Sequence, residues 1–202
     1  MTTTLRTLRT SKHWAELCPR PDEIDQGTRV GGKRVRPAGL HRIVSTVLEL
    51  PELWSEHVRF DLGERYVTRL HRDTDFEVWL ICWELGQDTL LHDHGGSVGA
   101  FGVAGGSLIE DHGDLRGGSL RTRTHPAGSS VAFGTDYLHN LVNIATEPAV
   151  TVHAYSQPLR RMNFYCWLPS GPHHLRELPC DSPEPDTGDL ERLAARTRTA
   201  HR

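Results

Sequence analysis

Short runs of β-branched and aromatic residues alternate with glycine-rich turns from about residue 65 to residue 169. The runs with the clearest pattern cover residues 76–83, 98–103, 107–110, 130–133 and 149–155. Many short strands at this spacing are typical of an antiparallel sandwich or barrel. We find no strand–helix–strand repeat here, so a parallel α/β sheet is not expected. This part of the chain is therefore predicted to be all-β.

The sequence before these runs has a helical pattern. Ile43, Val44, Val47 and Leu48 recur at the spacing of one helix face, and Pro51 would break or restart the helix. We expect one or two helices here, packed against the outside of the sheet. The predicted fold class is therefore all-β with flanking N-terminal helices.

Both ends of the chain are polar. Basic residues cluster around positions 33–36, and the end of the chain is rich in proline, aspartate and arginine. Such compositions favour mobile segments. We expect a basic flexible arm over residues 1–38, one domain over residues 39–178, and a flexible tail over residues 179–202 that contains a short frayed helix.

Composition excludes several classes of partner. The 202 residues carry a net charge of −3, which offers no strong attraction to nucleic acid or to an acidic membrane. No apolar stretch reaches the length of a membrane span, and no apolar segment of a secretory signal follows the first residues. The four cysteines form no Cys-x-x-Cys pair, which fits a reducing compartment. We expect a cytoplasmic protein without nucleic-acid or membrane partners.

Three histidines suggest a metal site. His92 and His94 are two residues apart, so on a strand both imidazoles would point to the same face. His139 lies on a later predicted strand, and closure of a barrel brings distant strands together. Neutral imidazoles are common ligands of transition metals. A His-x-His pair alone is also common on protein surfaces, so the third histidine carries much of this prediction.

The spacing around these histidines resembles the two motifs of the cupin proteins. His139 and Asn143 match the end of the second motif, but the glutamate of the first motif is absent, because Val98 and Gly99 occupy its two possible positions. The glycines that match the motifs are Gly86, Gly106 and Gly128. A metal on three neutral histidines would keep its full positive charge for an incoming thiolate.

Several segments, in the same order along the chain, resemble the type I cysteine dioxygenases, especially their bacterial branch. The segments are Tyr66-Val67-Thr68-Arg69, His92-Asp93-His94-Gly95-Gly96-Ser97, His139 with Asn143, and Thr151-Val152-His153-Ala154-Tyr155. The resemblance implies a small cupin-type β-barrel, or jelly roll. It also implies that Fe(II) is held by His92, His94 and His139.

The same resemblance implies roles for four further residues. Tyr155, His153 and Thr151 would form a catalytic proton network, and Arg69 would bind the substrate carboxylate. Thr151, His153 and Tyr155 alternate on a predicted strand, so their polar groups could form one hydrogen-bond relay. A buried network without a catalytic role, and a solvated arginine, are the alternatives that the residues alone leave open.

Two features depart from the family pattern. Mammalian members carry a cysteine, cross-linked to the tyrosine, where this chain has Gly99, so Tyr155 cannot carry that thioether. The serine-proline pair that commonly follows the tyrosine is replaced by Ser156, Gln157 and Pro158. The local turn is therefore expected to differ.

The activity expected from the resemblance is oxidation of L-cysteine with O2 to cysteine sulfinic acid. Another small thiol, such as 3-mercaptopropionate, is an alternative substrate, although Arg69 favours cysteine because relatives that act on other thiols often lack that arginine. An alternative from another class is a non-enzymatic cupin that senses a metal or ligand, with the basic arm as its output. The expected partners are the thiol and O2, and the expected state is a monomer or weak homo-oligomer.

Overall fold

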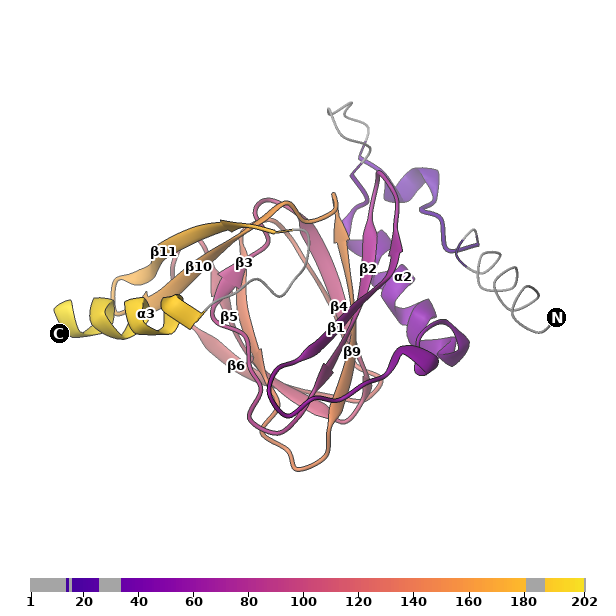
Figure 1. Cartoon of the computed structure of the whole chain (residues 1–202). Helices are drawn as coiled ribbons and strands as arrows, with labels where there is room; N and C mark the ends of the chain where they lie inside the picture. The colour runs from indigo at the N-terminus through magenta and orange to yellow at the C-terminus, as the bar shows by residue number, and fades with distance from the viewer. Residues whose placement is uncertain (1–13, 15, 26–33, 181–187, 202) are drawn as a thin grey trace.

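The computed structural model describes residues 14, 16–25, 34–180 and 188–201, which form a β-barrel built from two antiparallel sheets (Figure 1). The five-stranded sheet has the order β1 (Tyr66–Arg72), β2 (Glu77–Trp83), β9 (Ala149–Ser156), β4 (Val98–Gly105), β7 (Ser130–Phe133). The six-stranded sheet has the order β11 (Gly171–Pro179), β10 (Arg161–Leu168), β3 (His92–Asp93), β8 (Tyr137–Val142), β5 (Ser107–Asp114), β6 (Arg121–Pro126). The prediction of an all-β fold with a cupin-type small β-barrel, or jelly roll, is confirmed.

Strand β2 shows why the chain folds into two layers around a closed interior. Its side chains alternate, and every residue of the strand is buried. Val78, Leu80 and Cys82 pack in the core on the outer side of the sheet, whereas Trp79 and Trp83 pack in the barrel interior. A strand covered on both faces is apolar throughout, as residues 76–83 largely are.

Helix α2 (Pro37–Glu49) covers the outer face of the five-stranded sheet (Figure 1). Proline stands at its first position, where no amide hydrogen is needed, and Pro51 begins the next short helix. Its apolar face is fully buried, each aliphatic side chain contributing about 1.5–3 kcal/mol. The 3₁₀-helices η2 (Pro51–Leu53) and η3 (Ser55–His57) follow, so the predicted N-terminal helices are confirmed.

Glycine at position 102 of β4 allows this helix to approach closely. A Cβ atom there would lie 2.7 Å from Cδ1 of Leu48 and 3.0 Å from Cγ1 of Val44, so these two side chains of α2 would have to move. Within the part of the chain that the structure describes, no helix is both long and apolar enough to span a bilayer.

Part of the N-terminal segment packs against the domain. The 3₁₀-helix η1 (Pro21–Glu23) is followed by a β-bridge between Ile24 and Val35. Val35 is fully buried, and its amide donates a hydrogen bond of 2.8 Å to Oγ of Ser156, the last residue of β9. Residues 26–33, which include part of the predicted basic cluster, lie outside the described residues. The predicted division into arm, domain and tail stays a prediction.

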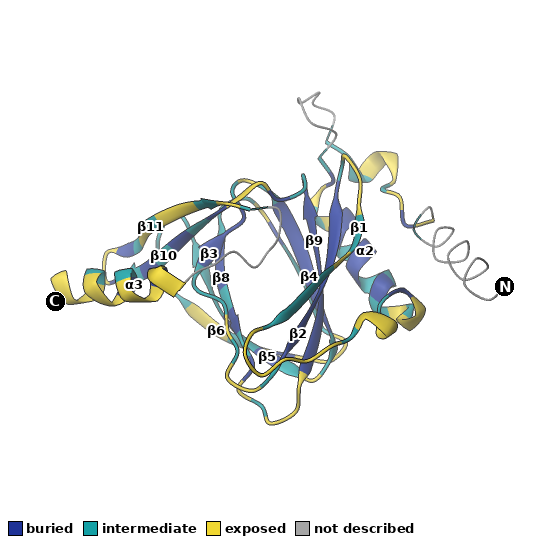
Figure 2. Cartoon of the chain, viewed as in Figure 1, coloured by how far each residue is buried: buried dark blue, intermediate teal, exposed yellow. Residues whose placement is uncertain are grey.

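The hairpin of β10 and β11 extends away from the barrel and is covered by helix α3 (Gly188–Ala200) (Figures 1 and 2). Leu190 packs with Met162 and Phe164, and Ala194 packs with Cys166 and Leu168. The helix expected near residues 190–196 is therefore present and carries two buried side chains.

Candidate metal centre

The structure brings the three predicted ligands together inside the barrel. His92 lies on β3 opposite His139 on β8, and His94 follows β3 directly. One ring nitrogen from each histidine lies within 4.8 Å of those of the other two. All three side chains are buried. The tertiary fold thus assembles a compact set of three imidazoles from segments about 45 residues apart in the sequence.

The second ring nitrogens show which atoms face a metal. Nδ1 of His92 donates to the carbonyl oxygen of Leu90 at 2.6 Å, and Nδ1 of His139 donates to Oε1 of Glu110 at 2.8 Å. Carbonyl and carboxylate oxygens only accept, so the hydrogens lie on Nδ1 and leave Nε2 as a lone-pair donor. Nε2 of His94 is buried and has no hydrogen-bond partner among the described residues. A metal ion would satisfy that orphaned nitrogen, so the residues fit a metal site.

The electrostatics favour the form of histidine that binds metal. Burial holds the pKa of His92 well below its usual range, and the neighbouring His139 lowers it further. Burial also lowers the pKa of His94, with added effects of His92 and His139. Both imidazoles are therefore neutral near pH 7, as metal ligation requires.

Thr151, His153 and Tyr155 form a connected chain on the interior face of β9. Oγ1 of Thr151 lies 2.8 Å from Nε2 of His153, and the Tyr155 hydroxyl lies 3.3 Å from Nδ1 of the same ring. Trp83 donates from Nε1 to Oγ1 of Thr151 at 2.9 Å. The hydroxyl hydrogen of Thr151 is then directed to the shorter contact, which is with His153 rather than with the Ile81 carbonyl at 3.4 Å.

This chain ends beside the histidine cluster. The Tyr155 ring lies 4.8 Å from the ring of His94, measured between centroids. Burial, and to a lesser extent the nearby His139, lower the pKa of His153 to about 3. His153 is therefore neutral and can accept at one nitrogen while donating at the other.

Arg69 lies at the edge of the same interior face. In the sheet it stands opposite Trp79, which stands opposite His153, so the three side chains form one row across β1, β2 and β9. Its guanidinium lies 5.0 Å from the centre of the Trp79 ring, and its side chain is 38% exposed. A stacked, partly exposed guanidinium is accessible to a ligand from solvent.

Sequence reasoning missed two buried carboxylates. Glu77, on β2, lies opposite Tyr155 on β9 and accepts a hydrogen bond from the Leu159 amide at 2.7 Å. Its Oε2 lies 3.9 Å from Nη1 of Arg69 and 3.3 Å from Nη1 of Arg72. Burial raises the pKa of Glu77.

Glu110 is the second missed carboxylate, and it contacts His139. Burial alone would raise its pKa, but hydrogen bonds from His125 and His139, together with Arg123, hold the pKa well below its usual range. The signal for both residues was present in the sequence. Each is an acidic residue at an inward position of a strand, and Glu110 shares its face with Leu108.

The turn after Tyr155 is the segment where the sequence departs from the family's serine-proline pair. The peptide bond between Ser156 and Gln157 is cis, and Pro158 follows it. Ser97, three residues after the predicted ligand His94, donates from its hydroxyl to the carbonyl oxygen of Gln157 at 2.8 Å. The turn therefore links the end of the relay strand to the loop that follows His94.

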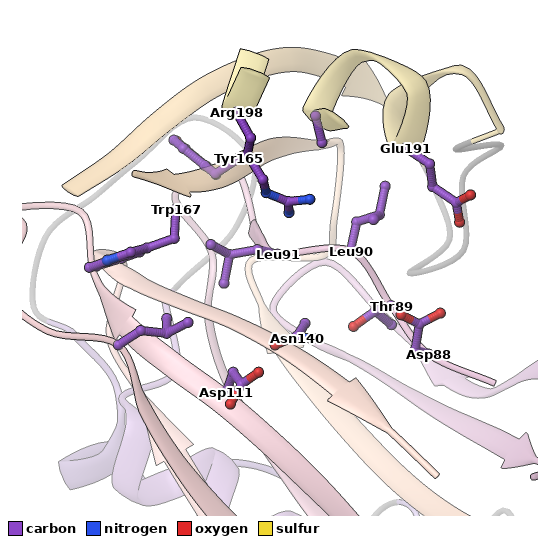
Figure 3. Close-up of a pocket in the computed structure, with 12 residues that line it drawn as sticks. Asp88, Thr89, Leu90, Leu91, Asp111, Asn140, Tyr165, Trp167, Glu191 and Arg198 are labelled. Carbon is purple, nitrogen blue, oxygen red and sulfur yellow. The ribbon is translucent and has the colours of Figure 1, made fainter. Parts of the chain in front are cut away.

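A separate cavity of about 350 Å³ lies outside the barrel, between helix α3 and the outer face of the six-stranded sheet (Figure 3). Its lining includes Asp88, Tyr165, Trp167, Glu191 and Arg198. None of the three clustered histidines lines it. It is therefore distinct from the candidate metal centre.

Comparison with known proteins gives one family. The family model described as "Cysteine dioxygenase type I" matches residues 39–166. A protein of Danio rerio named "Cysteine dioxygenase type 1" is 31% identical over 121 residues. That match covers 54% of this chain and 60% of the Danio rerio protein, so the chain spans about three fifths of its curated relative.

Solved structures similar to this chain share low sequence identity with it. The protein TT1209 from Thermus thermophilus has a TM-score of 0.45 and 15% identity, covering 50% of this chain and 91% of that one. An uncharacterized conserved protein with a double-stranded β-helix domain from Klebsiella pneumoniae has a TM-score of 0.43 and 22% identity, covering 50% and 84%.

Proposed function

The chain belongs to the type I cysteine dioxygenase family, and from this membership we propose that it is an iron-dependent thiol dioxygenase that oxidises L-cysteine. In the proposed reaction both atoms of O2 become bonded to the cysteine sulfur, which gives cysteine sulfinic acid without another reductant. The observation that carries the proposal is a buried set of three histidines, next to the Thr151–His153–Tyr155 chain, with no carboxylate in the set among the residues that the structure describes.

His92, His94 and His139 would hold the metal through their Nε2 atoms. Ferrous iron, when bound, would supply the positive charge and redox chemistry that bring a thiolate and dioxygen together. The burial of the cluster restricts water around it. Aromatic rings complete its walls: Phe133 lies 4.9 Å from His94, and Phe164 lies 6.0 Å from His92, between ring centroids.

Arg69 would orient the substrate through its carboxylate. A guanidinium offers parallel N–H donors that match the two oxygens of a carboxylate. Stacking on Trp79 restricts the guanidinium, and its partial exposure leaves donors accessible to the ligand. Glu77 adds a negative charge close behind it, which would hold Arg69 in place.

Tyr155 and His153 would manage the proton of the thiol. The Tyr155 hydroxyl is held by Nδ1 of His153, while its ring packs on His94. Thr151 and Trp83 in turn fix the imidazole of His153 from its other nitrogen. The Tyr155 hydroxyl is thus held by His153, which is itself held by Thr151. A hydroxyl positioned in this way is suited to donate a hydrogen bond to a substrate bound at the three histidines.

The family and the composition support the remaining proposals. We propose a cytoplasmic enzyme whose partners are the small thiol and O2, with no nucleic acid involved. A monomer or weak homo-oligomer stays our proposal for its assembly state.

The test is aerobic turnover of the iron-loaded full chain with L-cysteine and, separately, with 3-mercaptopropionate. Oxygen uptake and sulfinate product are followed together. We expect one sulfinate per O2 with cysteine and slower turnover of the analogue. Faster turnover of 3-mercaptopropionate would change the substrate and keep the dioxygenase. No oxygen uptake with either thiol, at verified iron occupancy, would overturn the enzyme and favour the metal-binding sensor.

A further inference from the structure

Glu110 stands at the centre of a cluster of hydrogen-bond donors. Its Oε1 accepts from Nδ1 of His139 at 2.8 Å and from the Tyr137 hydroxyl at 2.7 Å. Its Oε2 accepts from Nε2 of His125 and from Nε of Arg123, each at 2.7 Å. A carboxylate offers about four lone-pair positions, so these donors saturate it. Glu110 is therefore not available as a metal ligand itself.

The register of three strands creates this cluster. Strand β5 lies between β8 and β6, and Arg123 stands directly opposite Glu110 in the β5–β6 pair. His125 stands opposite Leu108, and His139 stands opposite His112, which places both histidines diagonally from Glu110. Diagonal neighbours on one face are within reach of long side chains. The carboxylate is fully buried, so its position is determined by these partners.

The two oxygens of Glu110 accept hydrogen bonds from different groups of residues. Oε2 accepts from Arg123 and His125, neither of which belongs to the three-histidine cluster. Oε1 accepts from His139, which does belong to it. Because this oxygen only accepts, His139 keeps its hydrogen on Nδ1 and leaves Nε2 for the cluster that it forms with His92 and His94. A carboxylate behind a metal-bound histidine fixes the ring and makes it a stronger ligand.

This arrangement bears on the missing glutamate of the cupin motif. At the two positions where that glutamate could stand, the chain has Val98 and Gly99 on β4. A carboxylate does serve the site, but it acts from behind His139 rather than as a direct ligand. Three open positions on a metal are compatible with this arrangement, whereas a fourth protein ligand would occupy one of them.

We propose that Glu110 is a positioning residue that fixes the tautomer and ring orientation of His139 and thereby strengthens metal binding at the three-histidine site. The inference rests on the metal site of the proposed function and is independent of the proposed substrate. His125 contacts the other oxygen, Oε2, so it supports Glu110 rather than the proposed ligand His139.

The first experiment measures the affinity of the full chain for Co²⁺ alone, by competition with a chromophoric chelator. Glu110→Gln is expected to bind Co²⁺ about 10–100-fold more weakly, and to change the visible spectrum of the bound ion. Glu77→Gln is the matched control, since it makes the same substitution at another buried carboxylate, whose Oε2 faces Arg69 and Arg72. It is expected to lower the unfolding temperature while its Co²⁺ affinity stays within about threefold of wild type.

The outcomes separate this inference from the proposed function. Wild-type protein that does not bind Co²⁺ would overturn the metal site and this inference with it. Wild-type binding with equal affinity in a folded Glu110→Gln variant would overturn only the role of Glu110. An equal loss in Glu77→Gln would also overturn it, because the effect would then follow from the loss of any buried carboxylate rather than from the contact with His139.

A second measurement needs no variant and covers the case in which Glu110→Gln does not fold. Full-length protein labelled with ¹⁵N-histidine and loaded with Zn²⁺, which is diamagnetic, is examined by NMR. We expect His139 to carry a slowly exchanging hydrogen on Nδ1 and to bind the metal through Nε2. A His139 ring that binds through Nδ1, or that exchanges its Nδ1 hydrogen freely, would overturn the proposal.

Discussion

The ring of Phe133 occupies the space that a side chain at position 99 would need. A Cβ atom on Gly99 would lie 2.4 Å from Cζ of Phe133 and 3.1 Å from Cδ1 of Tyr155. Gly99 also stands between these two residues in the sheet, opposite Phe133 on β7 and opposite Tyr155 on β9. At position 99 of this barrel, the space beside Tyr155 is filled by an aromatic ring from the neighbouring strand.

Gly99→Ala is therefore expected to destabilise the fold. The added methyl group has to displace the ring of Phe133 in a packed interior, which costs about 1–3 kcal/mol. Gly105→Ala is the control on the same strand, because a Cβ atom there meets nothing within 4 Å. Urea unfolding of both metal-free variants measures the difference. Equal stability of the two variants would show that Phe133 moves aside freely.

Arg69→Gln is expected to weaken the use of carboxylate-bearing thiols. Loss of a charged pair with a carboxylate lowers kcat/KM for cysteine by about 10–100-fold. Arg72→Gln is the matched control, since Arg72 has similar exposure and also contacts Glu77. Steady-state kinetics with cysteine and with cysteamine, a thiol without a carboxylate, give the comparison. A similar loss with cysteamine would contradict the anchoring role.

Tyr155→Phe is expected to reduce turnover more than it reduces binding. The variant keeps the ring against His94 and removes only the hydroxyl that His153 holds. Loss of a positioned proton donor lowers kcat by about 100-fold or more, and the ratio of sulfinate formed to O2 consumed should fall as well. Tyr66→Phe, on the outer-core side of β1, is the control. If Tyr155→Phe keeps the wild-type kcat and the wild-type ratio of sulfinate to O2, then the Thr151–His153–Tyr155 chain has only a structural role.

The metal-free protein is expected to lose stability as the pH falls from about 6.5 toward 3. His153 has a pKa of about 3 in the folded protein and an unfolded value of 6.5, so in this window only the unfolded state binds the proton. Binding of that proton stabilises the unfolded state, so the free energy of unfolding decreases with falling pH. His92 and His94 act in the same direction.

The contribution of His153 is isolated by comparison with His153→Asn. Unfolding free energies of the two metal-free proteins are measured by urea denaturation between about pH 6.5 and pH 4, which lies within the window set by the two pKa values. The variant should show a shallower slope, while His173→Asn, at an exposed position of β11, should follow the wild type. Parallel curves for His153→Asn and wild type would contradict the buried, neutral state of His153.

The sequence by itself determined the features that depend on local periodicity. Alternation of apolar residues fixes which side chains of 76–83 share a face, and it places His92 with His94 and Thr151 with His153 and Tyr155. Period-two alternation is a property of every extended strand, so it is readable without knowledge of neighbouring strands. The helix before Pro51 follows from the same kind of local pattern.

Only the tertiary structure decided what depends on strand order and register. Glu110 contacts His139 because β5 lies between β6 and β8, and Glu77 meets Arg69 because β1 pairs with β2 in one particular register. Pairings between strands far apart in the chain are not encoded in any single segment. They arise when the sheet closes into a barrel and the buried polar groups find partners, which is why the contact between Glu110 and His139 became visible only in the folded molecule.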